Sequence, residues 1–232
     1  MFRTDAVNPN SVNLAHDVRV SKVLKNAYLL LAVSLIPSII GAALGARFPI
    51  AYQLGFWMLP IFIGVMFGMN FLIMKNRNSV SGIGWLLLYT LILGFFIGPL
   101  IGSIMGSFTN GFQIVASAVG STAAIFFALA GYAAATKKNL STPGMGNLIA
   151  VGMTIALIMM VLNFFIQVPA VTLALSTMFA VISSCLIVYT INGVVRGGET
   201  NYIMVTLSLY ISLYNIFSWA LHMFSMFFGS HD

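Results

Sequence analysis

The run of residues 78–136 reads NSVSGIGWLLLYTLILGFFIGPLIGSIMGSFTNGFQIVASAVGSTAAIFFALAGYAAAT and holds no Asp, Glu, Lys or Arg over 59 residues. A helix crosses the hydrocarbon core of a membrane with about 20 apolar residues, because it covers roughly 30 Å at about 1.5 Å per residue. This run is therefore long enough for two crossings. The polar cluster GSFTNG at residues 106–111 predicts the turn between them.

The rest of the 232-residue chain repeats the pattern, since charged residues make up only 6% of it and soluble domains carry about 25%. Other charge-free runs cover 26–46, 48–74, 139–195 and 200–231, and the longest of these breaks at residues 167–169. A soluble globular domain is excluded, and membrane β-strands would alternate polar and apolar residues. We therefore predict an all-α integral membrane protein, a bundle of seven transmembrane helices. The predicted helices are 26–46, 54–74, 83–105, 112–135, 145–167, 170–193 and 202–228.

Flanking segments are predicted to be tails: residues 1–25 a polar cytosolic N-terminal tail, and residues 229–232 a short C-terminal tail. Lys and Arg are retained on the cytoplasmic side of membranes. With the N-terminus inside, the outer segments hold Arg47 alone, and the inner segments hold Arg3, Arg19, Lys22, Lys25, Lys75, Arg77, Lys137, Lys138 and Arg196. This predicts a cytoplasmic N-terminus and a C-terminus outside. Because the basic residues are dispersed at helix ends, membrane lipids are the expected partner and nucleic acid is not.

Small residues predict where helices pack. In lipid, close backbone approach must supply much of the contact energy between helices. The third predicted helix carries glycines at a spacing of four, and the fourth offers a similar stripe as a plausible partner. These two stripes are Gly94, Gly98, Gly102 and Gly106, and Ala116, Gly120, Ala124 and Ala128.

Chemistry is sparse along this chain. The acids are Asp5, Asp17, Glu199 and Asp232, and none lies in a predicted span, where a proton relay or carboxylate cage would need one. There is no HExxH, GxSG or Walker-type glycine loop, and Cys185 has no neighbouring base. We therefore expect no catalytic residues, no metal site, no cofactor and no enzymatic activity.

Polar residues collect instead in the last two predicted helices. In the last helix they follow each other at steps of four, three, four and three, which places them on one helical stripe. These residues are Ser208, Ser212, Asn215, Trp219 and His222, and the preceding helix contributes Ser183, Ser184, Tyr189, Thr190 and Asn192. Two interpretations fit: hydrogen bonding between helices, or a polar pathway or ligand cavity.

The loop Gly197-Gly198-Glu199-Thr200-Asn201-Tyr202 and the helix after it resemble the C-terminal signature of the Bax inhibitor-1 family, in particular its bacterial YccA-like branch. The resemblance covers roughly residues 20–228. It implies a seven-helix protein of the bacterial cytoplasmic (inner) membrane. It further implies a non-enzymatic regulator that binds and modulates the membrane-bound AAA+ protease FtsH, and this is the leading functional hypothesis.

The family also suggests an alternative, a cation leak channel that conducts calcium ions. Related calcium-leak members carry a pair of aspartates on helices six and seven as a pH-dependent latch, and the matching positions here are Thr190 and Ser212. Neither side chain can titrate, so two carboxylates sharing a proton are chemically absent and pH gating is not expected. An ungated pathway would use the candidate residues Thr190, Ser208, Ser212, Asn215 and His222.

Overall fold

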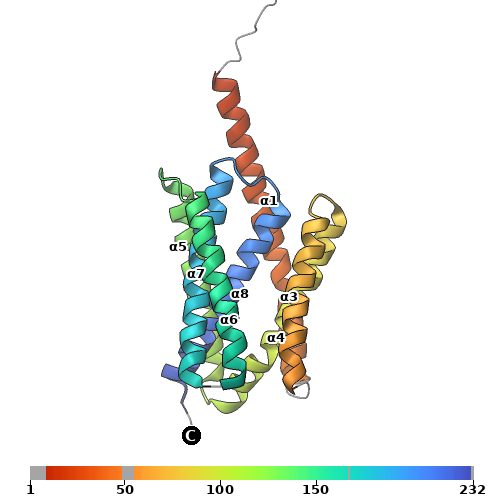
Figure 1. Ribbon diagram of the computed structural model, residues 1–232, viewed down its shortest axis with the longest axis vertical. Helices are drawn as coiled ribbons and strands as arrows, with labels where there is room; N and C mark the ends of the chain where they lie inside the picture. The colour runs from red at the N-terminus through yellow and green to blue at the C-terminus, as the bar shows by residue number, and fades with distance from the viewer. Residues whose placement is uncertain (1–8, 49–54, 167, 231–232) are drawn as a thin grey trace, which may run out of the picture.

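The computed structural model describes residues 9–48, 55–166 and 168–230, which fold into a bundle of long helices (Figure 1). The elements are α1 (Pro9–Arg47), the 3-10 turn η1 (Gly55–Trp57), α3 (Met58–Lys75), α4 (Val80–Ser107), α5 (Gly111–Ala135), α6 (Pro143–Ile166), α7 (Pro169–Val195) and α8 (Tyr202–Phe228). Each helix runs antiparallel to the next along the chain, because the connections between them are short.

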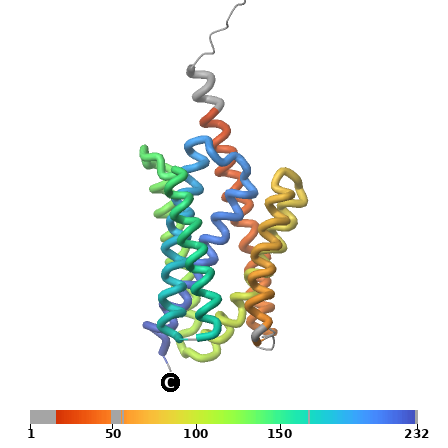
Figure 2. The backbone as a smooth tube through the Cα atoms, in the orientation of Figure 1, coloured from red at the N-terminus to blue at the C-terminus, as the bar shows by residue number. Residues whose placement is uncertain are grey.

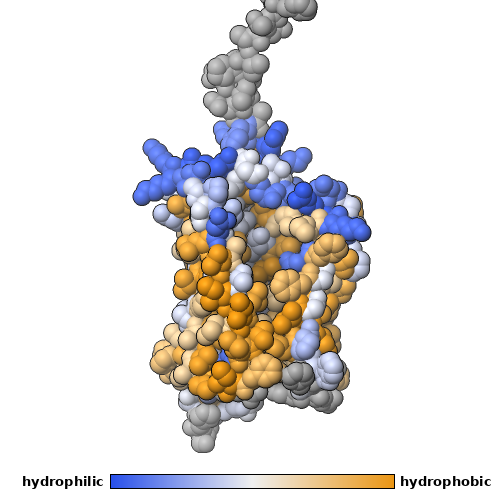
Figure 3. Space-filling view, viewed as in Figure 1, coloured by the Kyte–Doolittle hydropathy of each residue, from blue (hydrophilic) through white to orange (hydrophobic). Residues whose placement is uncertain are grey.

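Seven of the helices in the described residues are long and apolar enough to cross a membrane. Apolar side chains form a broad belt around the bundle, with polar side chains gathered at one end above it (Figure 3). The predicted fold class, an all-α membrane bundle with seven spans, is confirmed.

The N-terminal part of α1 differs from the prediction. The helix begins at Pro9, so residues 9–25 of the predicted tail are helical, while residues 1–8 lie outside the described residues. Proline favours the first turn of a helix, and no glycine or further proline interrupts the chain until Pro37. Hydropathy cannot detect this extension, because it rises above the apolar span.

Helix ends elsewhere lie close to the prediction. The second predicted helix was placed at 54–74, but α3 begins at Met58 after the η1 turn, and residue 54 lies outside the described residues. The other five predicted helices agree with the structure to within three residues at each end. Of the predicted C-terminal tail, Gly229 and Ser230 follow the end of α8, and residues 231–232 lie outside the described residues.

Helix α8 is the centre of the bundle. Half of its most apolar window is buried, against 11% for α3 and for α6. It contacts α1, α4, α5 and α7, and Figure 2 shows it running between the α6–α7 pair and the α3–α4 pair. Its side chains Ile203, Leu209, Ile216 and Leu221 are fully buried. Helices α3 and α6 lie at the edges, packed mainly on α4 and α7 respectively.

Gly94, Gly98 and Gly102 of α4 pack against α1 in the most extensive helix contact of the bundle. Gly106, the fourth member of the predicted stripe, does not take part, since a Cβ there would meet no atom within 4 Å. A Cβ placed at Gly94 would overlap the carbonyl of Ser38, and one at Gly98 would lie 2.5 Å from the carbonyl oxygen of Ala42. In return, a Cβ at Gly45 would overlap the carbonyl of Phe95. The backbones of α1 and α4 therefore touch directly.

The predicted partner stripe on α5 was wrong. Its members Ala116, Gly120, Ala124 and Ala128 are all exposed, and a Cβ at Gly120 would meet no atom within 4 Å. Helix α5 instead turns Ile114, Ala118 and Phe126 inward, where larger side chains fill the space beside α8. The spacing of small residues on α5 did not show which face of that helix turns inward.

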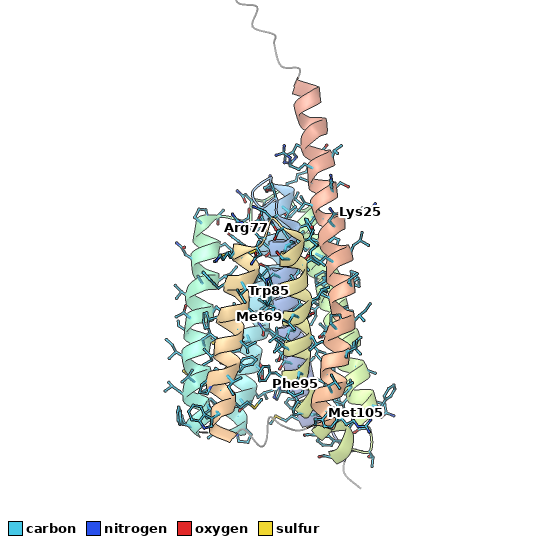
Figure 4. The ribbon with its side chains drawn as sticks, turned by 90° about the vertical axis from the view of Figure 1, so that its right-hand side faces the viewer. Lys25, Met69, Arg77, Trp85, Phe95 and Met105 are labelled. Carbon is cyan, nitrogen blue, oxygen red and sulfur yellow. The ribbon has the colours of Figure 1, made fainter. Side chains whose placement is uncertain are left out.

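Basic residues gather at one end of the bundle. Lys25 on α1 and Arg77 after α3 lie toward the end from which α1 projects, whereas Phe95 and Met105 lie in the opposite half (Figure 4). The same end carries the α5–α6 and α7–α8 loops, with Lys137, Lys138 and Arg196. Arg47 lies at the other end of α1. Of the ten basic residues, only Arg3 falls outside the described residues.

We predict that Gly98→Ala destabilises the protein by about 1–3 kcal/mol, because the new methyl group forces α1 away from α4. The matched change Gly120→Ala adds a methyl group on a lipid-facing surface and improves helix propensity, so it should leave stability unchanged or slightly raised. Unfolding by SDS in mixed micelles measures both variants. Equal destabilisation by the two substitutions would contradict the assignment of the α1–α4 backbone contact.

Candidate functional site

Two of the polar residues predicted on α8 join it to α7. Asn215 Nδ2 donates to Ser183 Oγ at 2.9 Å, and Trp219 Nε1 donates to Thr177 Oγ1 at 3.1 Å. Ser183 is completely buried. These bonds match the first interpretation of the stripe, hydrogen bonding between helices.

Other polar groups of the stripe bond within α8. The completely buried Ser212 donates its hydroxyl to the carbonyl of Ser208 at 2.9 Å, which satisfies it without a partner helix. His222 Nδ1 lies 2.7 Å from the carbonyl oxygen of Ser218. Side chains of this kind satisfy themselves against the preceding turn and need no water.

Thr190 and Ser212, the positions of the family's aspartate pair, are not opposite each other. The hydrogen bond between Ser183 and Asn215 places these two residues at the same level of α7 and α8. Because the two helices run antiparallel, the residue seven positions after Ser183 lies level with the residue seven positions before Asn215. Thr190 therefore lies at about the level of Ser208, and Ser212 is one turn away, about 6 Å along the axis. Neither hydroxyl bonds the other, although both residues are described and buried.

The signature loop gives α7 a defined end. Gly197 has φ 76°, and its N–H donates to the carbonyl of Val194, while the N–H of Gly198 donates to that of Gly193 at 2.8 Å. This pair of bonds is the Schellman motif, and a glycine favours the left-handed position within it. Glu199 Oε1 then accepts from the N–H groups of Thr200 and Asn201. The predicted signature residues thus form a compact turn.

Asn201 uses both ends of its side chain. Its Oδ1 accepts from the N–H groups of Ile203 and Met204, which caps the N-terminus of α8. Its Nδ2 donates to the carbonyl of Arg77 at 2.8 Å and to Asn78 Oδ1 at 2.9 Å, both in the α3–α4 loop. One amide therefore ties two loops together at the basic end.

Asn192, near the end of α7, performs the same task for the α5–α6 loop. It is completely buried, its Oδ1 accepts from the N–H of Leu140, and its Nδ2 lies 3.2 Å from the carbonyls of Ala133 and Lys138. The guanidinium of Arg196 donates to the carbonyl of Lys137. The α5–α6 loop is thereby held by the end of α7, and the α3–α4 loop is held by the signature loop.

A buried tyrosine cluster, which the sequence analysis did not single out, joins α1, α3, α4 and α8. Tyr210 donates its hydroxyl to the carbonyl of Thr90 at 3.2 Å, so the 2.7 Å contact with Ser38 Oγ must use the hydrogen of Ser38. Tyr89 accepts from Asn70 Nδ2 at 3.1 Å. Asn70 is the only Asn, Gln or charged residue in α3 before its terminal Lys75, and that isolation was the available signal.

One cavity of about 450 Å³ lies at the opposite end of the bundle, between the end of α6, the start of α7 and the end of α8. His222 lines it, whereas Thr190, Ser208, Ser212 and Asn215 do not. The five predicted pathway residues are therefore not gathered in this cavity. Within the described part of the chain, no three His, Cys, Asp or Glu side chains group as metal ligands would.

The family model described as "Inhibitor of apoptosis-promoting Bax1" matches residues 20–229. The chain belongs to this Bax inhibitor-1 family. It is 36% identical to "Modulator of FtsH protease YccA" of Escherichia coli strain K12, over 89% of this chain and 92% of the relative. The protein of Escherichia coli O6:H1 named "Inner membrane protein YccA" matches with the same identity and coverage. An uncharacterized membrane protein of Vibrio cholerae is 32% identical over 89% of this chain and 90% of its own.

These similarities confirm the resemblance drawn from the signature loop, including its YccA-like branch. Together with the seven apolar helices, they make the chain a multi-pass membrane protein. The family match begins at residue 20, within α1 and about three turns after its start at Pro9.

Tyr210→Phe should lower stability by about 1 kcal/mol, because it removes the bonds to Ser38 and to the Thr90 carbonyl from the centre of the bundle. Tyr132→Phe, a matched change at an exposed tyrosine of α5, should have no effect. Thermal unfolding in detergent compares the two. A neutral Tyr210→Phe would mean that the cluster contributes packing alone.

Asn201→Ala should cost about 2 kcal/mol, roughly half from the lost helix cap and half from the lost clamp on the α3–α4 loop. Asn201→Asp keeps an oxygen for the cap but lacks amide hydrogens for Arg77 and Asn78, so it should cost about half as much. The same unfolding assay separates these contributions. Equal losses for the two variants would contradict the double role of this side chain.

Proposed function

We propose that this protein is a non-enzymatic regulator of the inner membrane of bacteria that binds the membrane-bound AAA+ protease FtsH and modulates its activity. The observation that carries the proposal is the 36% identity to the relative named as a modulator of FtsH, which extends over nearly the whole of both chains. The shared length includes all seven helices, so the similarity is not limited to one segment.

The proposed orientation places the basic end in the cytoplasm. Lys and Arg side chains of four segments, the start of α1 and three loops, lie at this end (Figure 4). Cytoplasmic loops retain such residues. The N-terminus is then inside and the C-terminus outside.

The α1 extension supports a binding role. It extends beyond the other helices at the basic end (Figure 1). At its base, His16 lies beside Gly197 of the signature loop, and the side chains of Asp17, Val18 and Arg19 are exposed. A helix projecting into the cytoplasm offers a contact surface that does not require a partner to enter the bundle. We propose that this extension faces the cytosolic part of the protease.

Calcium conduction has less support in this geometry. No acidic residue in the described chain lies within the apolar part of a helix, and the α7–α8 side chains that face each other are hydrogen-bonded together. The structure thus provides no specific observation that favours this alternative.

The test is co-purification from gently solubilised membranes of an Escherichia coli strain that lacks its own YccA and produces the tagged full-length chain. FtsH should be recovered with the tag, and degradation of a membrane substrate of FtsH should slow as the chain is overproduced. Failure to recover FtsH, together with unchanged proteolysis, would refute the proposal.

A chain lacking residues 1–18 serves as the matched variant, because it keeps the apolar span of α1 and the contact of that span with α4. It should still accumulate in the membrane but should recover several-fold less FtsH. Full recovery would place the contact elsewhere on the bundle, without affecting the result for the complete chain.

A further inference from the structure

The cavity between α6, α7 and α8 is lined by both polar and apolar side chains. It has a volume of about 450 Å³ and is lined by Asn163, Phe164, Pro169, Thr172, Leu173, His222, Ser225 and Met226. It lies at the end of the bundle opposite the basic loops, which is the lower end in Figure 1. Around it, Phe165, Ile166 and Phe227 are exposed, as expected of side chains that face lipid.

Asn163 presents an acceptor with no partner. Its Nδ2 donates to Thr172 Oγ1 at 2.9 Å, and the hydrogen of that hydroxyl is directed to the carbonyl of Val168. In this arrangement Thr172 accepts from Asn163, and the amide oxygen points away from Thr172. The buried Oδ1 of Asn163 has no hydrogen-bond partner among the described residues. Buried polar atoms are almost always satisfied, so this oxygen is free to accept a hydrogen bond from a donor outside the chain.

His222 presents a second acceptor. The carbonyl of Ser218 can only accept, so the Nδ1 of His222, 2.7 Å away, carries the ring hydrogen. In the neutral ring, Nε2 is then an acceptor. The Ser225 hydroxyl adds no free hydrogen, because it donates to the carbonyl of His222. The lining contains no carboxylate and no Lys or Arg.

We propose that this cavity binds the headgroup of a phospholipid with a primary ammonium group, of the phosphatidylethanolamine type. An ammonium carries three hydrogens and can serve both acceptors, whereas a single hydroxyl can serve only one. Phe164, Leu173 and Met226 provide the apolar surface against which the glycerol and upper acyl chain pack. The occupant comes from the membrane itself, since the cavity opens among lipid-facing side chains.

Native mass spectrometry of the purified full-length protein tests the assignment, in micelles doped with equal amounts of dioleoyl phosphatidylethanolamine and dioleoyl phosphatidylcholine. Phosphatidylcholine is the matched probe, because its quaternary ammonium has no hydrogen to donate. We expect about fivefold more complexes with the ethanolamine lipid, the ratio that one additional hydrogen bond supplies. Equal retention of the two lipids would overturn the proposal.

Variants locate the site. Asn163→Leu and His222→Phe should each reduce the preference to near one, with helical content and elution volume unchanged. Thr154→Val removes an α6 hydroxyl outside the cavity, bonded to its own helix, and should retain the preference. Leu173→Trp fills the cavity and should reduce retention of both lipids. A preference that survives Asn163→Leu and His222→Phe would exclude this cavity as its source.

A third lipid distinguishes the donor. Dioleoyl phosphatidylglycerol, with hydroxyl groups in place of the ammonium, should compete less well than the ethanolamine lipid. Stronger retention of phosphatidylglycerol would overturn the assignment of an ammonium ligand.

Discussion

Backbone contact between α1 and α4 is the constraint on which the rest of the bundle depends. Lipid tails are as apolar as the helices they surround, so helices gain little by hiding apolar surface from lipid. Where Gly94 and Gly98 meet Ser38 and Ala42, the missing side chains let the two backbones come into contact. This pair provides a wall against which α8 packs, and the polar contact of Tyr210 with Ser38 and Thr90 fixes α8 to both helices at once.

Hydrogen bonding completes the structure at the basic end, where the chain leaves the helices. Three loops meet there. Asn192 and Arg196 hold the α5–α6 loop, and Asn201, in the turn after α7, holds the α3–α4 loop. The signature loop is therefore structural in a definite sense. Its glycines end α7, its glutamate holds the turn, and its asparagine begins α8 while it holds the loop between α3 and α4. Substitutions in the signature loop would therefore disturb several helices, although no residue of the loop lies in the apolar core.

The spans were predictable because hydropathy and length act on each helix alone, and residues 202–228 match α8 at both ends. Helix pairing was not predictable, because the spacing of small residues on α5 does not reveal that this stripe faces away from α4. The resemblance of the loop identified the family, but the contacts of Asn201 with Arg77 and Asn78 join residues more than 120 positions apart. The α1 extension was missed for another reason: a polar helix above the membrane has no hydropathy signal.

The hydrogen bonds of α8 bear on how such a protein can act. Asn215 and Trp219 are bonded to α7, and Ser212 is bonded to its own helix, so a water-filled path along this face would have to replace bonds already made. No carboxylate lies on this face of α8 that could attract a cation and offset the loss of those hydrogen bonds. The surfaces left free include the outer faces of α3 and α6, the basic loops and the start of α1. These outer surfaces suit the proposed action through the proteins and lipids that the bundle touches.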